Sequence, residues 1–344
     1  MLPDISVVVI TYNEEARVGD CLASILSVLE GLRLDVIVVD SASQDRTVEI
    51  ARRFPVRVVR LRDGGPRRPS IGRHVGTMLT EGRLVLFVDG DSVLEPAWIS
   101  PALGALESDP LLAGIAGASL AVLVGPEGET TVTDQYPGVE YDDPPYLSGS
   151  ALYRRDALER VGGWNPYMCG HEEPELGARL RAAGLRLRRL RIAMTRHYPK
   201  ASRETVSELV RRARRGYVPG LGQYARLALA RGEGPHAALA PIARYLQFAL
   251  LGCVGILTLA TALLLRSSWP VVAWAVLIGA VFAVFAIRAR SLRKPAYYFC
   301  EWALLTAPVL RGFLQRPAGA TNFREFPVEF DVVPTSSDPV RHAG

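Results

Sequence analysis

The stretch RLVLFVDGDSVLEP, Arg83 to Pro96, decides the fold, because an apolar run in it stops at two carboxylates. The run, Leu84 to Val88, has the length and composition of a buried β-strand. Asp89 and Asp91 follow it with only Gly90 between them. In extended backbone both carboxylates point to the same side, so each raises the other's pKa unless a cation lies between them. The pair predicts either an Mg2+ or Mn2+ site or an ordinary turn in which glycine supplies positive φ.

Similar apolar runs precede this strand, and stretches of helical character alternate with them. The runs are SVVVI (6–10), DVIVVD (35–40) and VRVVR (56–60), and the helical stretches lie near 15–29, 45–54 and 71–80. This alternation predicts an α/β protein with a Rossmann-like, mostly parallel, doubly wound sheet. Ligands of such a sheet bind beyond the carboxyl ends of its strands, so the polar residues there are expected on one rim. No dinucleotide-binding or P-loop motif follows any of these strands, so a phosphate must be held in another way.

The composition narrows the class of protein. Apolar residues make up 49% of the 344, which is enough to fill a core. The four cysteines are scattered without a C-x-x-C pair, so neither a disulfide framework nor a zinc site is expected. The net charge is +5, but the basic stretch from Arg179 to Arg215 leads towards a membrane-like region, so no nucleic-acid partner is expected.

The last third of the chain predicts a transmembrane hairpin. Tyr245–Leu265 carries no charge over about 21 residues, roughly 31 Å as a helix, and a second uncharged run spans 267–287. A buried helical pair in a soluble core is the alternative. Basic residues at both outer ends predict a multi-pass protein of the inner or plasma membrane with its catalytic domain in the cytoplasm. We expect a catalytic domain at 1–230, including a basic interfacial segment at 200–230, a hairpin at 240–290, an interfacial or re-entrant helix at 291–316, and a loop-like tail at 317–344.

Four motifs taken together point to a known family. They are VVVITYNEE, VVDSASQDRT, LVLFVDGDS and the run SGSALYRRDALERVGGWNPYMCGHEEPELGARLRAAG. In this order and spacing, over about Ile5 to Tyr217, the chain strongly resembles the family 2 glycosyltransferases, which have the GT-A fold. The resemblance implies a nucleoside diphosphate sugar donor, a UDP- or GDP-sugar, and a divalent metal, Mg2+ or Mn2+.

The resemblance also implies a donor site. The residues that would hold the nucleotide sugar are Thr11, Tyr12, Asn13, Glu14, Asp40, Arg73, Asp89 and Gly90. The implied metal ligands are Asp89, Asp91 and His197. Tyr12 as an aromatic at the edge of the core and His197 as a hydrogen-bonded surface residue are the alternatives. His74 stands where the family often has asparagine, which leaves the contact of Arg73 with a diphosphate open.

Glu172 and Glu173 correspond to the Glu-Asp motif of the family, and Glu173 replaces the aspartate as general base. The alternative is that these acids only favour the first turn of a helix. The implied acceptor-binding residues are Gly149, Trp164, Arg211 and Arg214, with a hydrophobic plug as the alternative for Trp164. The glutamine and tryptophan of the processive Q-x-x-R-W motif are missing.

The sequence therefore predicts an inverting, metal-dependent glycosyltransferase that acts at the cytoplasmic membrane face on a hydroxyl of a lipid-linked or glycan acceptor, as in exopolysaccharide synthesis. A polyprenyl-phosphate glycosyl synthase, whose acceptor is a phosphate, is one alternative. A membrane scaffold that has kept the fold without catalysis is the other.

Overall fold

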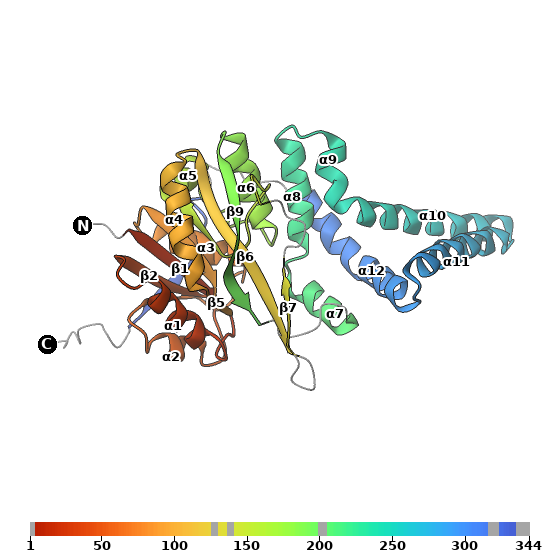
Figure 1. Ribbon diagram of the computed structural model, residues 1–344. Coiled ribbons are helices and arrows are strands. Elements are labelled where there is room, and N and C mark those ends of the chain that lie inside the picture. Colours follow the sequence, from red (N-terminus) through yellow and green to blue (C-terminus); the bar gives the residue numbers. More distant parts are fainter. Residues whose placement is uncertain (1–3, 125–129, 136–140, 199–204, 316–322, 335–344) are drawn as a thin grey trace. The chain divides into compact units, whose positions relative to one another are not determined.

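The computed structural model describes residues 4–124, 130–135, 141–198, 205–315 and 323–334 (Figure 1). The chain divides into two compact units, residues 1–200 with 318–344 and residues 201–317. The first unit thus ends earlier than the expected boundary at residue 230. The reason is that residues 206–230 form helices that pack within the second unit.

A mixed sheet forms the centre of the first unit. Its described strands lie in the order β10-β3-β2-β1-β4-β8-β6-β9-β5, and β7 pairs with β6. The strands are β1 (Ile5–Thr11), β2 (Leu34–Asp40), β3 (Arg57–Leu61), β4 (Leu84–Asp89), β5 (Ser92–Leu94), β6 (Leu112–Val124), β7 (Thr130–Asp134), β8 (Ala151–Arg154), β9 (Arg186–His197) and β10 (Phe330–Val333). The pairs among β3, β2, β1 and β4 are parallel, as expected, whereas β8, β5 and β10 join antiparallel. The class is α/β, but the sheet as a whole is mixed.

The parallel centre explains why the predicted strands read as continuous apolar runs. Val7, Val8 and Val9 of β1 have no exposed surface, because β1 lies between β2 and β4 and both sheet faces are covered. Thr11 pairs with Asp40, and Ile10 pairs with Asp89. The three strands therefore end at the same edge, which is the expected rim.

Six helices accompany the described strands of the first unit. They are α1 (Val18–Val28), α2 (Thr47–Ala51), α3 (Pro69–Met78), α4 (Ile99–Ser108), α5 (Arg155–Arg160) and α6 (Glu172–Ala182). α3 begins with a proline, which has no N–H to leave unpaired in the first turn. α6 begins with Glu172, after His171 in the left-handed region with φ of 59°.

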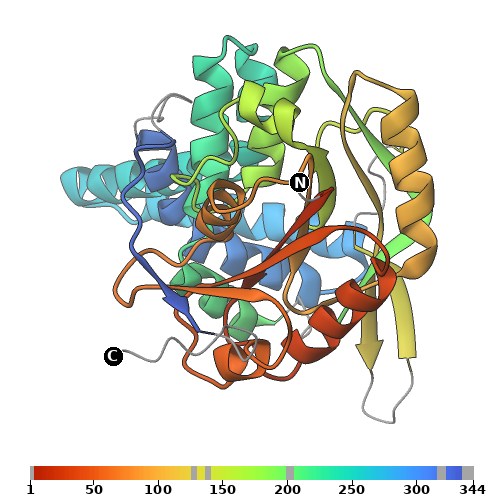
Figure 2. The same cartoon turned by 90° about the vertical axis from the view of Figure 1, so that its left-hand side faces the viewer.

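The prediction of a loop-like tail at 317–344 is wrong for residues 330–333, which form β10. β10 pairs antiparallel with β3, so the chain returns to the first unit after the second; Figure 2 shows this blue segment beside the orange strands. Phe326, Val328 and Phe330 pack against the core at alternate positions. This period of two is the strand pattern, and it extends over too few residues to be recognised without its partner.

The second unit is helical. It contains α7 (Val206–Arg215), α8 (Pro219–Ala230), α9 (Pro235–Leu239), α10 (Ala243–Leu265), α11 (Trp269–Ala289) and α12 (Arg293–Leu314). Gly222 of α8 and Gly312 of α12 let these helices approach closely, since a Cβ at either would collide with backbone of the other helix. The expected segment 291–316 is thus one long helix packed on α8, with Pro308 inside it.

Two helical stretches, Pro235–Leu265 and Trp269–Ala289, are long and apolar enough to cross a membrane, and little of either is buried. Their positions confirm the expectation of two long apolar helices. Arg266 ends the first with φ of 49°, which makes the connection short.

Candidate functional site

Position 90 is a glycine because there is no space for a side chain, not because the backbone has a conformation that only glycine adopts. Its N–H donates to Ile10 O at 2.9 Å, so it continues the contact of β4 with β1. A Cβ at this position would lie 2.5 Å from Thr11 Cγ2 and 3.0 Å from Ile10 O. Its φ is not positive, so the simple turn interpretation of Asp-Gly-Asp does not explain this glycine. The sequence favours glycine here because β1 is too close for any side chain.

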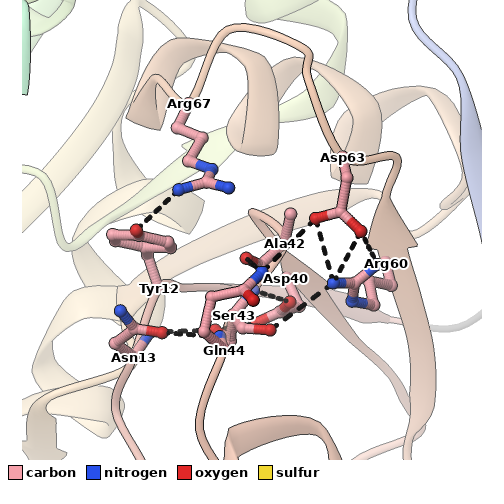
Figure 3. Close-up of polar contacts among 9 residues, drawn as sticks. All are labelled: Tyr12, Asn13, Asp40, Ala42, Ser43, Gln44, Arg60, Asp63 and Arg67. Atoms are coloured by element: carbon pink, nitrogen blue, oxygen red, sulfur yellow. Dashed lines mark hydrogen bonds and ion pairs between the residues drawn. The ribbon is translucent and has the colours of Figure 1, made fainter.

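Asp40 orders the turn that follows β2. Its carboxylate accepts hydrogen bonds from Thr11 Oγ1 at 2.9 Å, from Ser43 N at 2.8 Å and from Ser43 Oγ at 2.5 Å (Figure 3). Asp40 has no exposed surface. The structure therefore differs from the expectation of a direct ribose or base contact, because the oxygens of Asp40 already bind the turn.

The turn after β1 is tied to the turn after β2. Asn13, with φ of 55°, accepts from Gln44 N at 2.8 Å through Oδ1, and its own N–H donates to Ser43 Oγ at 2.8 Å. The N–H of Glu14 donates to Thr47 Oγ1 at 2.7 Å. Thr11, Asn13 and Glu14 are therefore brought together as expected, mostly as the frame of the site.

Arg67 lines a cavity at this rim and contacts Tyr12. Arg67 Nη1 donates to the Tyr12 hydroxyl at 2.7 Å, and the guanidinium carbon lies 5.0 Å from the centre of the ring (Figure 3). A cavity of about 270 Å³ opens beside Arg67 and Ala42. The sequence did not single out Arg67 or Asp63, which also lines it; the signal was their place in the Gly/Pro/Arg loop after β3.

Arg73 is the centre of a charged cluster. From α3, Nη2 donates to Asp89 Oδ1 at 3.0 Å, and Nη1 donates to Glu172 Oε1 at 2.7 Å and lies 3.4 Å from Glu173 Oε1. The side chain is only 3% exposed. Arg73, Asp89 and the two glutamates are thus brought together as predicted, although 99 residues separate Arg73 from Glu172.

Gly149 lies at the point where these side chains meet. A Cβ there would collide with Arg73 Nη2 and lie 2.9 Å from Asp89 Oδ2 and 3.3 Å from Glu173 Oε1. Glycine at this position therefore leaves room for the three side chains to come together.

We expect Gly149→Ala to remove most activity and to lower the free energy of unfolding by about 1–3 kcal/mol, because the methyl group forces Arg73 away from Asp89. Denaturant unfolding and a transfer assay measure the two effects. Gly104→Ala is the matched control, since nothing lies within 4 Å of a Cβ at Gly104. Equal effects of Gly149→Ala and Gly104→Ala would contradict the steric clash that we expect at Gly149.

Glu172 and Glu173 differ in access. The Glu172 side chain is 4% exposed, whereas that of Glu173 is 21% exposed. Burial raises the pKa of both carboxyl groups, and the neighbouring Glu173 carboxylate raises the pKa of Glu172 further. Of these two glutamates, Glu173 is the one that combines exposure with a raised pKa, which are the properties that a general base needs.

Asp91, two residues after Asp89, contacts His197. His197, at the end of β9, places Nε2 2.7 Å from Asp91 Oδ2, and its Nδ1 lies 2.6 Å from Gln135 Nε2. Ser119 Oγ donates to Gln135 Oε1 at 3.1 Å. Gln135, which the sequence did not single out, thus fixes the orientation of His197 in the way that outer partners orient metal ligands.

These residues fit a divalent metal. Burial and the Asp91 carboxylate raise the pKa of Asp89, although the Arg73 guanidinium opposes this. Three carboxylates, those of Asp89, Glu172 and Glu173, therefore share one guanidinium, and a cation near Asp89 and Asp91 would relieve the repulsion between the acids. Carboxylate oxygens with an imidazole suit Mn2+ and Mg2+. Among the described residues, no group of three or more such side chains is close enough to hold a metal alone, so further ligands would have to come from substrate.

Trp164 is not placed to stack on a sugar. It has no exposed surface and packs edge-on against Phe87, with ring centres 5.2 Å apart. This burial favours the alternative of a hydrophobic plug over a direct contact of Trp164 with an acceptor sugar. His74 is buried beside it, which lowers the pKa of His74 to about 4 and keeps it neutral, like the asparagine that it replaces.

Arg211 and Arg214 belong to α7 of the second unit. The cluster around Arg73 consists of residues of the first unit.

Residues 6–162 match the family described as Glycosyl transferase family 2. Residues 6–162 are thus similar to a glycosyl transferase family 2 domain. The match to the glycosyltransferase domain includes Asp40, Arg73, Asp89, Asp91 and Gly149, and ends before α6.

Several glycosyltransferases are similar to parts of this chain. Glycosyltransferase AglE of Haloferax volcanii is 31% identical over 102 residues, which are 28% of this chain and 34% of AglE. The poly(ribitol-phosphate) beta-N-acetylglucosaminyltransferase TarS of Staphylococcus aureus is 31% identical over 124 residues, 33% of this chain and 21% of TarS. A dolichyl-phosphate hexose transferase of Haloferax volcanii is 48% identical over 56 residues, 16% of this chain and 24% of that protein. The matches span about a third or less of each relative.

The mannosyltransferase PcManGT of Pyrobaculum calidifontis, solved in complex with GDP-Man and Mn2+, has a similar structure. The TM-score is 0.54 at 19% sequence identity, and the match covers 91% of this chain and 88% of PcManGT. This similarity supports the GT-A fold predicted from the sequence.

Proposed function

We propose that the protein is an inverting, metal-dependent glycosyltransferase that moves a sugar from a UDP- or GDP-sugar to a hydroxyl of a lipid-linked or glycan acceptor at the cytoplasmic membrane face. The observation that carries this proposal is the cluster at Gly149. There Arg73 joins Asp89 to Glu172 and Glu173 in a space kept open by the glycine, on the rim where ligands of such sheets bind.

The donor would bind across the carboxyl ends of β1, β2 and β4. Tyr12, held by Arg67, offers an aromatic surface to the nucleoside, while Asp40 keeps the neighbouring turn in shape. We assign the metal to Asp89, Asp91 and His197, with oxygens of the donor diphosphate as the further ligands that the site requires. When bound, Mg2+ or Mn2+ would neutralise charge on the departing diphosphate. Arg73 adds a fixed positive charge at the same place.

The reaction requires one proton acceptor. Glu173 takes the proton of the acceptor hydroxyl while that oxygen bonds to the anomeric carbon, and the bond from this carbon to the diphosphate oxygen breaks. The products are the glycosylated acceptor and the nucleoside diphosphate. A single displacement inverts the anomeric configuration. Glu172, buried against Arg73, acts as a positioning residue.

The second unit would anchor the enzyme in the membrane, where a lipid-linked acceptor would be bound. The stretches Pro235–Leu265 and Trp269–Ala289 would form a membrane hairpin, and the basic residues at its outer ends favour the cytoplasm. α7 separates basic from apolar side chains, as helices on an anionic bilayer surface do. We assign Arg211 and Arg214 to the lipid or acceptor headgroup.

A phosphate acceptor is the second candidate. It is favoured by the similarity to a protein named dolichyl-phosphate hexose transferase, 48% identical over 56 residues. A polyprenyl phosphate needs no strong base, so the two candidates differ in their dependence on Glu173.

The experiment that tests the proposal is transfer by purified full-length protein in detergent with Mn2+, UDP- and GDP-sugars and a membrane lipid extract. The expected product has the opposite anomeric configuration to the donor sugar, as read by NMR. A product with retained configuration, or no turnover of any donor, would contradict it.

The dependence of transfer on pH should show the raised pKa of Glu173. The base works as a carboxylate, so the rate should fall as pH drops through a pKa above 4.5, the ordinary value. In this window the folded protein binds more protons than the unfolded chain, so stability should fall as pH rises while activity increases. Profiles of kcat/KM and of Tm against pH measure both trends. An acidic limb at or below pH 4.5 would rule out Glu173 as a perturbed base.

A further inference from the structure

We propose that residues 326–329, which follow the helical second unit, form one wall of the pocket for the donor nucleoside and determine which nucleotide binds. The inference rests on the proposed function, because it assigns the rim cavity to the donor. It gives a role to a segment that the sequence left without one.

The cavity lies between two parts of the chain that are far apart in sequence. One side comes from the ends of β2 and β3 and the loop after them, and the other from the return segment. The lining residues used here are Ala42, Asp63 and Arg67 on the first side and Phe326, Val328 and Glu329 on the second. A nucleobase is a flat apolar ring with a polar edge, and this mixture of surfaces suits it.

The return segment is fixed in place by several contacts. Arg62 N donates to Glu329 O at 3.0 Å, and Arg62 Nη1 pairs with Glu329 Oε2 at 2.5 Å. The Phe326 ring packs edge-on against Tyr167 with centres 5.0 Å apart. Phe323 is buried, with the Arg179 guanidinium 5.2 Å above its ring. The wall is therefore pre-formed, and β10 continues it as part of the sheet.

The proposed wall comes late in the sequence. The first unit consists of residues 1–200 and 318–344, so the whole helical second unit lies between the two parts of the sequence that line the cavity. The donor pocket is then complete only in a chain that continues beyond the second unit to the return segment.

The alternative is that the segment only covers the edge strand β3. Two positions separate the roles. Val328 is partly buried and lines the cavity, whereas Val332 is 71% exposed on β10 and does not. Replacing each by tryptophan makes the same change inside and outside the proposed pocket.

The test is titration calorimetry of UDP and GDP, with Mn2+, on full-length wild type, Val328→Trp and Val332→Trp. We expect Val328→Trp to weaken nucleotide binding at least about tenfold, because the indole would fill the space that the base occupies and the base would lose its contacts there, and Val332→Trp to bind as wild type. Equal binding by all three proteins, or equal loss in both variants, overturns the inference. If wild type binds neither nucleotide, the proposed function itself fails.

A second measurement uses only wild type, so it does not require a variant to fold. Amide hydrogen exchange of wild type should slow in residues 326–333 when the preferred nucleotide and Mn2+ are added. Unchanged exchange in this segment, in a protein that binds the nucleotide, overturns the inference and leaves the proposed function intact.

Discussion

Glu173→Gln is expected to lower transfer to a hydroxyl acceptor by about 10²–10⁴-fold, the usual contribution of a general base. The amide has the shape of the carboxylate but cannot accept the proton. Glu173 makes only a 3.4 Å contact with Arg73 Nη1, whereas Glu172 makes the shorter one, so the cluster should persist. Donor binding should therefore be unchanged.

The measurement is initial transfer rate together with nucleotide affinity for wild type and variant. Glu159→Gln, at an exposed position of α5, is the control and should match wild type. Transfer to a polyprenyl phosphate at the wild-type rate, with transfer to hydroxyls absent, would identify the phosphate acceptor. Wild-type transfer to a hydroxyl by the Glu173 variant would remove Glu173 as the base.

Asp91→Asn is expected to weaken Mn2+-dependent donor binding by about 100-fold or more, since even outer partners of metal ligands contribute 10–100-fold. The side chain is 21% exposed and faces His197, so the change leaves the apolar core untouched. The Tm without metal should therefore stay close to that of wild type.

The measurement for Asp91 is nucleotide affinity with and without Mn2+. Asp20→Asn, at an exposed position of α1, is the matched control. Normal Mn2+-dependent affinity in the Asp91 variant would show that Asp91 is not a metal ligand.

The strands that carry the site were predictable, because β1, β2 and β4 are buried on both faces and read as apolar runs. The same property predicted that Thr11, Asp40 and Asp89 share a rim. The antiparallel additions to the sheet were not predictable, since they depend on pairing between distant segments. β10 is the extreme case, because Phe330 pairs with Leu61.

The cluster was predicted in its members but not in its geometry. The resemblance placed Arg73, Asp89 and Glu173 in one site, but only the structure shows that Gly149 makes room for all three. The full burial of Trp164 and Asp40 was not predictable, because a sequence does not show whether a side chain near a site is exposed.

The most direct test of the central claim is titration of UDP-sugars and GDP-sugars into purified full-length protein, first with Mn2+ and then after chelation by EDTA. The account predicts that one class of donor binds with Mn2+ and that the affinity falls by about 100-fold or more in EDTA. Failure of every donor to bind, or binding of equal strength in EDTA, would contradict a metal-dependent glycosyltransferase.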